Sequence, residues 1–502
     1  MKIGKLILAL LVLAVAFGGG LWYGKQQSTT IIAANDAGGS YGGGFRSAEP
    51  DAKPRATAAR GPGGTVHQVR EGEAIQDAVN AAEPGDTIRI FPGTYTETVY
   101  IDKDGIRLIG VIEQGNWPTL EGEKRLNDAI LYSGNDIVVE NLKITNYKGN
   151  GIMGQAGNNF EIRNNLIIDT GVYGIFPQLG QNGIVEDNVV SGIEDAAIYV
   201  GMSDNIHVAG NEVFDSVAGI EIENSRHAIV ENNYVHHNTG GILAFITPGL
   251  PIKTTYDVII RDNFIVDNNT PNFGAPGSTV AGIPAGTGVL IMAADEVVIE
   301  NNIIRDHQTA GILVVDHANA SNITADPDAD PAPDQVAILD NLMLNNGYDT
   351  IDEVRALMLA TMTRGTPDIV RAGEVRDSCI RNRHRYTTIG LGDFADCAFS
   401  NTDNIDNYLL PEPVPPREID PSEQGKLTYL GICTGCHSYK GILIGPPVEM
   451  IQAMYRDDPA GIAAYIADPV KKRPTFPEMP PQDYLDPEVR LAVAEYLLTV
   501  GN

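Results

Sequence analysis

The residues Cys433-Thr434-Gly435-Cys436-His437 carry the clearest chemistry in this chain of 502 residues. They fit C-x-x-C-H, the pattern that attaches a c-type haem. Two thiols at this spacing can add to the two vinyl groups of one haem, and the next residue brings an imidazole to the iron. A zinc site would need two further ligands, but no Cys or His follows His437, and a dithiol redox site would need a βαβ context. We therefore predict one haem bound covalently to Cys433 and Cys436, with His437 as an iron ligand.

The second iron ligand is expected to be a methionine, because no histidine lies downstream. Met450 and Met454 are four residues apart on an expected helix, which is also the spacing of two core side chains. Met479 lies in Pro477-Glu478-Met479-Pro480-Pro481, where prolines stiffen the loop. We therefore predict Met479 as the second ligand. Ligation by His and Met raises the reduction potential and suits an electron carrier.

The segment from Pro421 to the end resembles class I cytochrome c over about 80 residues. The resemblance implies that the carbonyl of Pro446 accepts a hydrogen bond from His437 and orients its ring. It also implies a last helix over 489–500, with Tyr496 packed against the first helix at Gly425. The spacing of that first helix is kept by Gly425, Tyr429 and Cys433.

A short phrase recurs along the middle of the chain, in which a polar residue and an asparagine precede an apolar strand. Its asparagine steps by 24, 23, 23, 22, 30, 39 and 39 residues. Segments this short cannot bury a face alone, but stacked copies can pair strand on strand. We therefore predict a parallel β-solenoid of eight turns with a ladder of amide side chains, and loops in the longer steps at 248–255, 271–288 and 319–335. The asparagines are Asn141, Asn165, Asn188, Asn211, Asn233, Asn263, Asn302 and Asn341.

A short amphipathic helix expected at 75–82 precedes the repeats and would cover the open edge of the first turn. With the following Pro84-Gly85-Asp86-Thr87, residues 65 to about 345 resemble the right-handed parallel β-helix superfamily of the pectin lyases. Within it they are most similar to the carbohydrate-binding and sugar-hydrolase branch, which includes the periplasmic copper-maturation protein of nitrous oxide reductase. The resemblance implies a fold and leaves the function open, because one fold serves many chemistries.

Catalytic residues on this rod are not identified by the sequence. Alginate epimerases resemble the chain at Tyr173-Gly174, but Phe176-Pro177-Gln178-Leu179 replaces their Asp-Pro-His-Asp signature. Polar residues of the repeats could gather on one face as a sugar or copper site, or lie on solvent-facing turns; they are Glu221, Glu223, His227, His236, His237, Asp316 and His317. An acidic loop could bind calcium or could simply be solvated; it contains Asp326, Asp328, Asp330 and Asp334.

The charge and the N-terminus indicate where the protein works. A net charge of −30 argues against a nucleic-acid partner, whose phosphates require basic residues. The apolar run from Leu6 to Tyr23 follows two lysines and is either an uncleaved membrane anchor or a signal peptide cleaved after Ala14-Val15-Ala16. Trp22 and Tyr23 are typical of a membrane interface and favour the anchor. Export to the periplasm permits a disulfide between Cys379 and Cys397, the two cysteines outside the haem motif.

These predictions combine into a mainly β protein: a right-handed parallel β-helix followed by a small all-α cytochrome c domain. The expected order is an anchor or signal (1–25), a flexible linker (26–64), the β-helix with an irregular C-terminal cap (65–410), a Pro-rich linker (411–420) and the cytochrome c domain (421–502). The favoured function is electron transfer by a monohaem cytochrome tethered to the inner membrane, whose rod binds a redox partner, a glycan, or a metal such as calcium or copper. The alternatives are a polysaccharide-active enzyme of lyase or epimerase type coupled through the haem to a redox partner, and a sugar- or copper-binding module.

Overall fold

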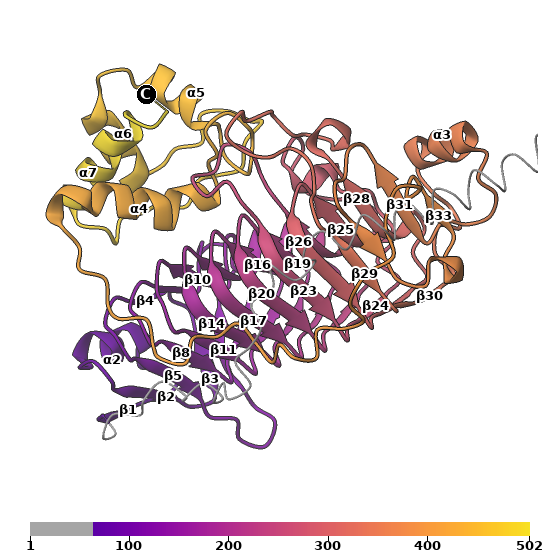
Figure 1. The fold of residues 1–502 in the computed structure, drawn as a ribbon. Helices are drawn as coiled ribbons and strands as arrows, with labels where there is room; N and C mark the ends of the chain where they lie inside the picture. Colours follow the sequence, from indigo (N-terminus) through magenta and orange to yellow (C-terminus); the bar gives the residue numbers. More distant parts are fainter. Residues whose placement is uncertain (1–63, 502) are drawn as a thin grey trace, which may run out of the picture. The chain divides into compact units, whose positions relative to one another are not determined.

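A computed structural model describes residues 64–501, which form a parallel β-helix and a group of short helices (Figure 1). The β-helix has three parallel sheets of 12, 11 and 10 strands. Strands that are neighbours in a sheet come from successive turns of the coil, so that β11, β14 and β17 follow one another in register. The mainly β, solenoidal fold predicted from the repeat is therefore confirmed.

Sheet A contains β1(Val66–Val69), β2(Thr87–Ile90), β5(Arg107–Gly110), β8(Val138–Glu140), β11(Glu161–Arg163), β14(Gln181–Glu186), β17(Asp204–Ala209), β20(Arg226–Glu231), β23(Tyr256–Arg261), β26(Asp295–Glu300), β29(Ala337–Leu339) and β32(Cys379–Ile380). Sheet B contains β3(Gly93–Tyr95), β6(Pro118–Glu121), β9(Lys143–Thr145), β12(Leu166–Ile168), β15(Val189–Ser191), β18(Glu212–Phe214), β21(Tyr234–His236), β24(Phe264–Val266), β27(Ile303–Arg305) and β30(Leu342–Leu344). Sheet C contains β4(Val99–Ile101), β7(Ile130–Tyr132), β10(Ile152–Gln155), β13(Tyr173–Gln178), β16(Ala196–Gly201), β19(Ala218–Glu223), β22(Gly240–Phe245), β25(Thr287–Met292), β28(Ala310–Val315), β31(Ile369–Ala372) and β33(Thr388–Ile389).

The interior of the coil is filled by aliphatic side chains that recur at one position in each turn. In sheet A, Ile162, Val185, Val208 and Val230 pair in successive turns and are buried. Each such side chain contributes about 1.5–3 kcal/mol when it leaves water. Sheet C has an equivalent inward column, which includes Ile152, Ile175, Ile198, Ile220 and Ile242.

Between sheets A and B, each turn of the repeat bends at a residue of positive φ that precedes a buried asparagine. Asn, Asp or Gly occupies the bend, because these residues tolerate the left-handed conformation. Each buried asparagine donates from Nδ2 to Oδ1 of the next one at 2.9–3.0 Å. Because each amide also bonds to backbone groups, its buried polar atoms are satisfied. The ladder contains Asn165, Asn188, Asn211, Asn233, Asn263, Asn302 and Asn341.

The structure corrects the predicted repeat at its start and in its length. Asn141 lies at the bend with a φ of 61°, and Leu142 occupies the ladder position, where its backbone N–H donates to Asn165. The first step, from Asn141 to Asn165, is 24 residues and not 23 because Asn141 lies one residue before the ladder position. The coil also extends beyond eight turns, because β1 to β7 and the final strands continue it without a ladder asparagine. The three predicted loops are confirmed between β22 and β23, β24 and β25, and β28 and β29.

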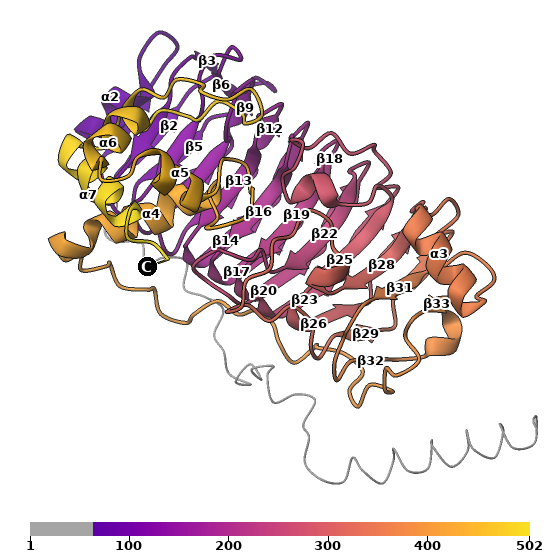
Figure 2. The same cartoon turned by 90° about the horizontal axis from the view of Figure 1, so that it is seen from above.

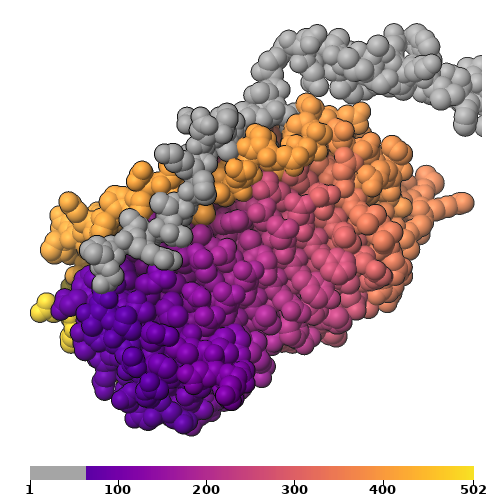
Figure 3. Space-filling view, turned by 90° about the horizontal axis from the view of Figure 1, so that it is seen from below, coloured from indigo at the N-terminus to yellow at the C-terminus, as the bar shows by residue number. Residues whose placement is uncertain are grey.

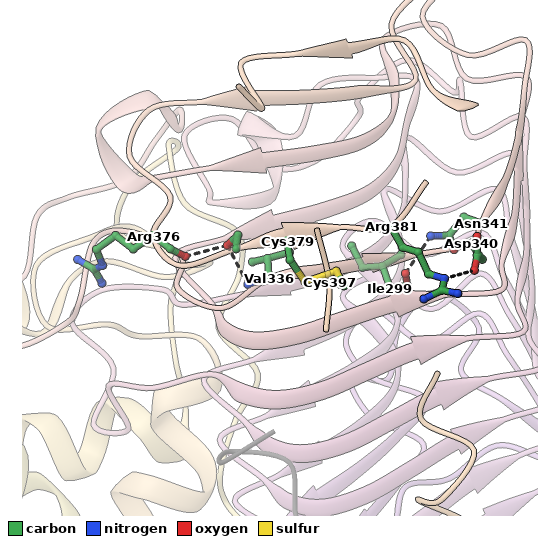
Figure 4. Close-up of a disulfide and its surroundings, with 9 residues drawn as sticks. Ile299, Val336, Asp340, Asn341, Arg376, Cys379, Arg381 and Cys397 are labelled. Carbon is green, nitrogen blue, oxygen red and sulfur yellow. Dashed lines mark hydrogen bonds and ion pairs between the residues drawn. A yellow bond between two sulfur atoms is a disulfide. The ribbon is translucent and has the colours of Figure 1, made fainter. Parts of the chain in front are cut away.

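Each end of the coil has its own covering. Helix α2(Ile75–Ala81) follows the first strand and buries Ile75 and Val79 against the core, as predicted for a cap. Near the other end, helix α3(Asp352–Thr361) precedes β31, and a disulfide joins Cys379 of β32 to Cys397 (Figure 4). Beside it, Arg381 Nε donates to Asp340 at 2.9 Å.

After the last strand the chain returns along the turns that precede it, and we call residues 402–414 the return segment (Figure 3). The backbone N–H of Thr402 donates to Glu300, and the carbonyl of Tyr408 accepts from Asn205 at 2.8 Å. Further back, Leu410 N–H donates to Asn182 at 3.0 Å and Val414 N–H to Asn159 at 2.8 Å. The prolines predicted as a linker thus continue a segment that is hydrogen-bonded to the coil.

Residues 421–501, here called the helical segment, contain short helices joined by loops (Figures 1 and 2). Gly425 lies against the backbone of Ala492, where a Cβ would meet the carbonyl oxygen at 2.3 Å. Tyr496 of the last helix packs on Tyr429 of the first, with ring centroids 5.5 Å apart. The helices are η4(Pro421–Glu423), α4(Gln424–Ile432), η5(Cys433–Gly435), α5(Val448–Met454), α6(Pro459–Ala467) and α7(Pro487–Leu497).

Among residues 64–501, no helix has the length and apolar character needed to cross a bilayer. The predicted anchor and the linker that follows it lie outside the described residues.

Candidate functional site

The Cys-x-x-Cys-His motif forms one tight turn at the end of helix α4. Cys433 begins the 3₁₀ turn η5, and the backbone N–H groups of Cys436 and His437 both donate to its carbonyl, at 3.1 and 3.0 Å. This turn brings both thiols and the imidazole to one pocket of about 380 Å³. Burial raises the pKa of each thiol to about 12, so neither is a thiolate nucleophile at neutral pH.

His437 is held by its backbone neighbour and not by a charge. Its Nδ1 lies 2.8 Å from the carbonyl oxygen of Pro446, so Nδ1 is the donor and Nε2 is left to bind a metal. Burial lowers the pKa of this imidazole, which therefore stays neutral, as a ligand must be. Gly445 lies against the ring, where a Cβ would come within 2.4 Å of Cε1.

All three candidate methionines line the same pocket. The sulfurs of Met450 and Met454 lie 3.2 and 4.0 Å from the guanidinium of Arg473. Met479, on its proline-rich loop, is half-buried. The two helix α5 methionines are thus pocket residues and not members of a closed core. The remaining lining is largely apolar and includes Ile444, Ile451, Ile462, Ile466, Phe476 and Leu497.

The donor set fits a c-type haem: two thiols outside any disulfide, a neutral imidazole oriented through Nδ1, and a methionine on a loop across an apolar pocket. The pocket volume lies in the range of small-molecule and cofactor sites, about 300–1,000 Å³. Groups of three or more His, Cys, Asp or Glu side chains placed to share a metal ion are absent from residues 64–501.

The β-helix supplies one wall of this pocket and the contacts that hold the motif. Phe176 lies under Gly435, where a Cβ would meet its Cζ at 2.5 Å, and Gln178 donates to Thr434 at 3.0 Å. These two residues belong to the stretch that replaces the epimerase signature. Their positions on β13 face the helical segment.

A second cluster lies further along the outer face of sheet C. Glu221 and Glu223 on β19 lie beside Asp195, and Tyr199 on β16 donates its hydroxyl to Glu223. Burial raises the pKa of Glu221 and of Asp195 well above the usual range, and that of Glu223 to about 7. Tyr173 stacks on Tyr199 with ring centroids 4.4 Å apart.

The sequence pointed to the two glutamates but grouped them with the wrong partners. His227 is on sheet A, where Nδ1 lies 2.5 Å from Asp204, and His236 is on sheet B, 3.2 Å from Glu212. His317 lies 2.9 Å from the carbonyl of Ile246. Of the two alternatives, the single face of acids and histidines is therefore wrong, because neighbours in sequence fall on different sheets. Asp195 and Tyr199 were missed, although Tyr199 precedes Glu221 by one turn and a register count would have paired them.

The acidic loop before β29 is held in place by ion pairs with basic residues outside it. Asp326 accepts from Lys253 at 2.5 Å and from the backbone of Gly249 at 2.8 Å. Asp330 pairs with Arg376 at 2.5 Å. These contacts give the loop a structural role.

Comparison with known protein families supports the β-helical fold of the coil. A family model described as a right handed beta helix region matches residues 122–247 and 215–326. No curated protein matches the chain.

Several solved structures are similar at low identity. The A-module of Azotobacter vinelandii mannuronan C-5 epimerase AlgE4 is 12% identical, with a TM-score of 0.40, over 63% of this chain and 87% of that one. An alginate lyase from Paenibacillus sp. str. FPU-7 is 14% identical, with a TM-score of 0.36, over 57% and 99%. DFA-IIIase from Arthrobacter chlorophenolicus A6, without its lid, is 14% identical, with a TM-score of 0.40, over 64% and 96%. At these values the reactions of these proteins give no argument about the reaction of this chain.

Proposed function

We propose that this is an electron-transfer protein that holds one c-type haem in the pocket between the helical segment and the β-helix. The observation that carries the proposal is the convergence of Cys433, Cys436, His437 and Met479 on one apolar pocket. Cys433 and Cys436 would hold the macrocycle through thioether bonds, and His437 and Met479 would ligate the iron. Bound there, the haem would supply reversible one-electron transfer.

The surrounding residues support such a carrier in three ways. Pro446 fixes the tautomer and direction of His437. The apolar lining excludes water, which favours the less charged form of a bound redox group. Lys148 of the coil pairs with Glu478 of the methionine loop at 3.0 Å and so links that loop to the rod. We further propose that the rod presents the haem to a periplasmic redox partner, and that the N-terminal apolar run tethers the chain to the inner membrane.

The test is the absorption spectrum of the full chain made with a haem-attachment system. We expect haem that survives denaturing extraction, a low-spin reduced spectrum, and a weak iron–sulfur band in the oxidised far-red spectrum. Met479→Ala should remove that band and raise the high-spin fraction. Met454→Ala, in the same pocket, is the matched control and should leave the band unchanged. Extractable haem, or a high-spin wild-type spectrum, would exclude the proposed ligation.

A second candidate function is favoured by the carboxyl and tyrosine cluster of β16 and β19. Carboxyls with raised pKa values next to a tyrosine can act as acid and base, which is the chemistry that cleaves or epimerises sugar chains. In this case the haem would pass on electrons from an associated oxidase or dehydrogenase. The full chain would then degrade or epimerise a uronate polymer, and Glu223→Gln would abolish turnover while the haem spectrum stayed intact. Unchanged polymer in the presence of the wild-type chain would rule this function out.

A further inference from the structure

A second cavity, of about 720 Å³, lies on the outer face of sheet C beyond the helical segment. Its floor is a column of side chains that pair across successive strands: Leu243, Leu290 and Leu313, with Phe245 and Met292 beside them. Helix α3 and the turn at 278–284 form its walls. A cavity of this volume admits a ligand of drug or metabolite size. The proposed electron transfer makes no use of it.

One end of this apolar cavity is acidic. Glu221 lines the cavity and is 1% exposed, and its Oε1 has no hydrogen-bond partner. The Oδ1 of Asp195 is likewise buried and unpartnered. The charges that act most on Glu221 are those of Asp195 and Glu223, and no cation among the described residues is paired with it. Three buried carboxyls without a positive partner are costly, unless a ligand supplies the charge.

We propose that this cavity binds a small organic cation, with an ammonium group against Glu221 and an apolar chain or ring along Leu243, Leu290 and Leu313. Charge complementarity selects the head group, because a positive charge at this end relieves the mutual repulsion of the carboxyls. Phe245, which also lines the cavity, adds an aromatic face to which an ammonium is attracted. The apolar column selects the tail. The inference goes beyond the proposed haem function and does not depend on it.

The other classes of ligand fit less well. An organic anion could form no ion pair with Glu221 or Glu223. A metal ion would need ligands that converge, and no group of three or more such side chains is placed to share one within residues 64–501. A neutral amphiphile would fill the apolar part but would form no ion pair with Glu221.

Proton release is the signature of this binding mode. Glu221 is buried next to Asp195 and to Glu223 on its own strand, and burial and these two acids favour its protonated form; Tyr199 on β16 pairs with it across the sheet and donates its hydroxyl to Glu223. An ammonium ion favours the ionised carboxylate, so binding should displace a proton. Affinity should therefore rise from pH 6 to pH 9, below the ordinary pKa of an amine at about 10.4.

The experiment is calorimetry of the full chain with n-octylammonium, n-octanol and n-octanoate. We expect only the ammonium compound to bind strongly, with an enthalpy that depends on the ionisation enthalpy of the buffer. Glu221→Gln should weaken its binding by at least about tenfold, the usual scale for one partner of a buried charge pair. Glu353→Gln removes an exposed acid at the α3 wall of the same cavity and is the matched control; it should change the affinity by less than about twofold.

A second variant covers the case in which Glu221→Gln folds poorly. Leu290→Phe keeps the carboxyl and projects a larger ring into the cavity, so it should also weaken octylammonium binding. The proposal is overturned if octanol or octanoate binds as tightly as octylammonium, if Glu221→Gln folds and binds normally, or if octylammonium does not bind at millimolar concentration.

Discussion

At the scale of single residues, the Cys-x-x-Cys-His turn depends on a glycine that leaves room for the histidine ring. Gly445 precedes Pro446, whose carbonyl orients His437, and its missing side chain leaves room for the imidazole. A Cβ at this position would lie 2.4 Å from Cε1 of the ring. The ring and the carbonyl that fixes it cannot both keep their places once that atom is added.

Gly445→Ala should therefore disturb the histidine without touching either cysteine. We expect haem still attached, a larger high-spin fraction, and a free energy of unfolding lowered by about 1–3 kcal/mol through overpacking. The measurement is a visible spectrum with a thermal melt. Gly392→Ala is the matched control, since a Cβ there meets nothing within 4 Å. A spectrum identical to wild type would show that the ring adapts and that Gly445 is not needed to place it.

The meeting of the Cys-x-x-Cys-His residues at one pocket could be predicted from the sequence because they are close together in the chain. Cys433, Cys436 and His437 need only one turn of chain to reach one pocket. Glu221 and its neighbours could not be grouped in the same way, because Asp195 and Tyr199 meet them only through strand register. Sequence proximity instead suggested His227, which the next bend carries to another sheet.

At the scale of elements, the buried amide ladder connects each turn of the coil to the next by hydrogen bonds. Asn211 donates from Nδ2 to Asn233 and to the carbonyl of Val185, and its Oδ1 accepts from the backbone and side chain of Asn188. Removing one rung leaves buried donors and acceptors unpaired on both neighbours. The cost of a lost rung exceeds that of a lost surface hydrogen bond for this reason.

Asn211→Ala should lower the free energy of unfolding by roughly 3 kcal/mol or more, since several buried polar groups lose partners at about 1–3 kcal/mol each. Denaturant unfolding followed by circular dichroism measures it. The control is Asn80→Ala on the exposed side of α2, which should cost less than about 1 kcal/mol. A cost at Asn211 no larger than at Asn80 would contradict a stabilising ladder.

A second ladder contains a histidine in place of an amide. His307 accepts from Asn268 at Nε2 and donates from Nδ1 to Asn346, at 3.1 and 3.0 Å. Burial lowers the pKa of His307 to about 4, against 6.5 for the unfolded chain. Between these values the unfolded chain binds more protons, so stability falls as the pH falls. The protonated ring would donate at both nitrogens and lose its bond from Asn268.

His307→Asn should remove this acid sensitivity. Between pH 6.5 and pH 4 the wild type should lose roughly 3 kcal/mol relative to the variant, the equivalent of the pKa difference. The comparison must be made between the two proteins, because burial raises the pKa of Asp128 to about 6 and acts in the opposite sense. Parallel stability curves from pH 7 to pH 4 would contradict the neutral, buried imidazole.

The repeat period could be read from the sequence because each turn uses the same bend and the same inward asparagine. The turns without that asparagine, from β1 to β7, carry no such mark, so the count of turns left them out although residues 65–410 were predicted as β-helix. Asn141 was placed one residue out of register because its own turn has Leu142 at the ladder position. The period therefore predicts the fold, whereas register decides which side chains meet on the outer face of sheet C.

At the scale of the whole molecule, the return segment joins the last turns of the coil to the helical segment. Its backbone is paired with asparagines of three successive turns: Asn205 bonds to Tyr408, Asn182 to Leu410 and Asn159 to Val414. These asparagines have positive φ and direct their amides to the segment from the bends of sheet A. The sequence could not show this pairing, since the prolines at 411–416 predict only an extended chain.

The return segment should therefore open when its amide partners are removed, while the coil stays folded. In the double variant Asn159→Gly and Asn205→Gly, glycine keeps the left-handed backbone and deletes three hydrogen bonds to Tyr408 and Val414. At about 1 kcal/mol each, hydrogen exchange in 405–416 should rise by roughly tenfold or more. Asn164→Gly, at a bend of positive φ away from this segment, is the matched control.

The same experiment reports how the helical segment is held. Its own contacts with the coil, Gln155 to Tyr484 at 2.7 Å and Gln178 to Thr434 at 3.0 Å, are untouched by these substitutions. If these contacts suffice to hold the helical segment on the coil, hydrogen exchange in α4 and α7 should stay at the wild-type rate while the return segment opens. Faster exchange in α4 as well would mean that the return segment also holds the helical segment against the coil. Unchanged exchange in 405–416 would show that the asparagine pairing contributes little to holding the chain against the rod.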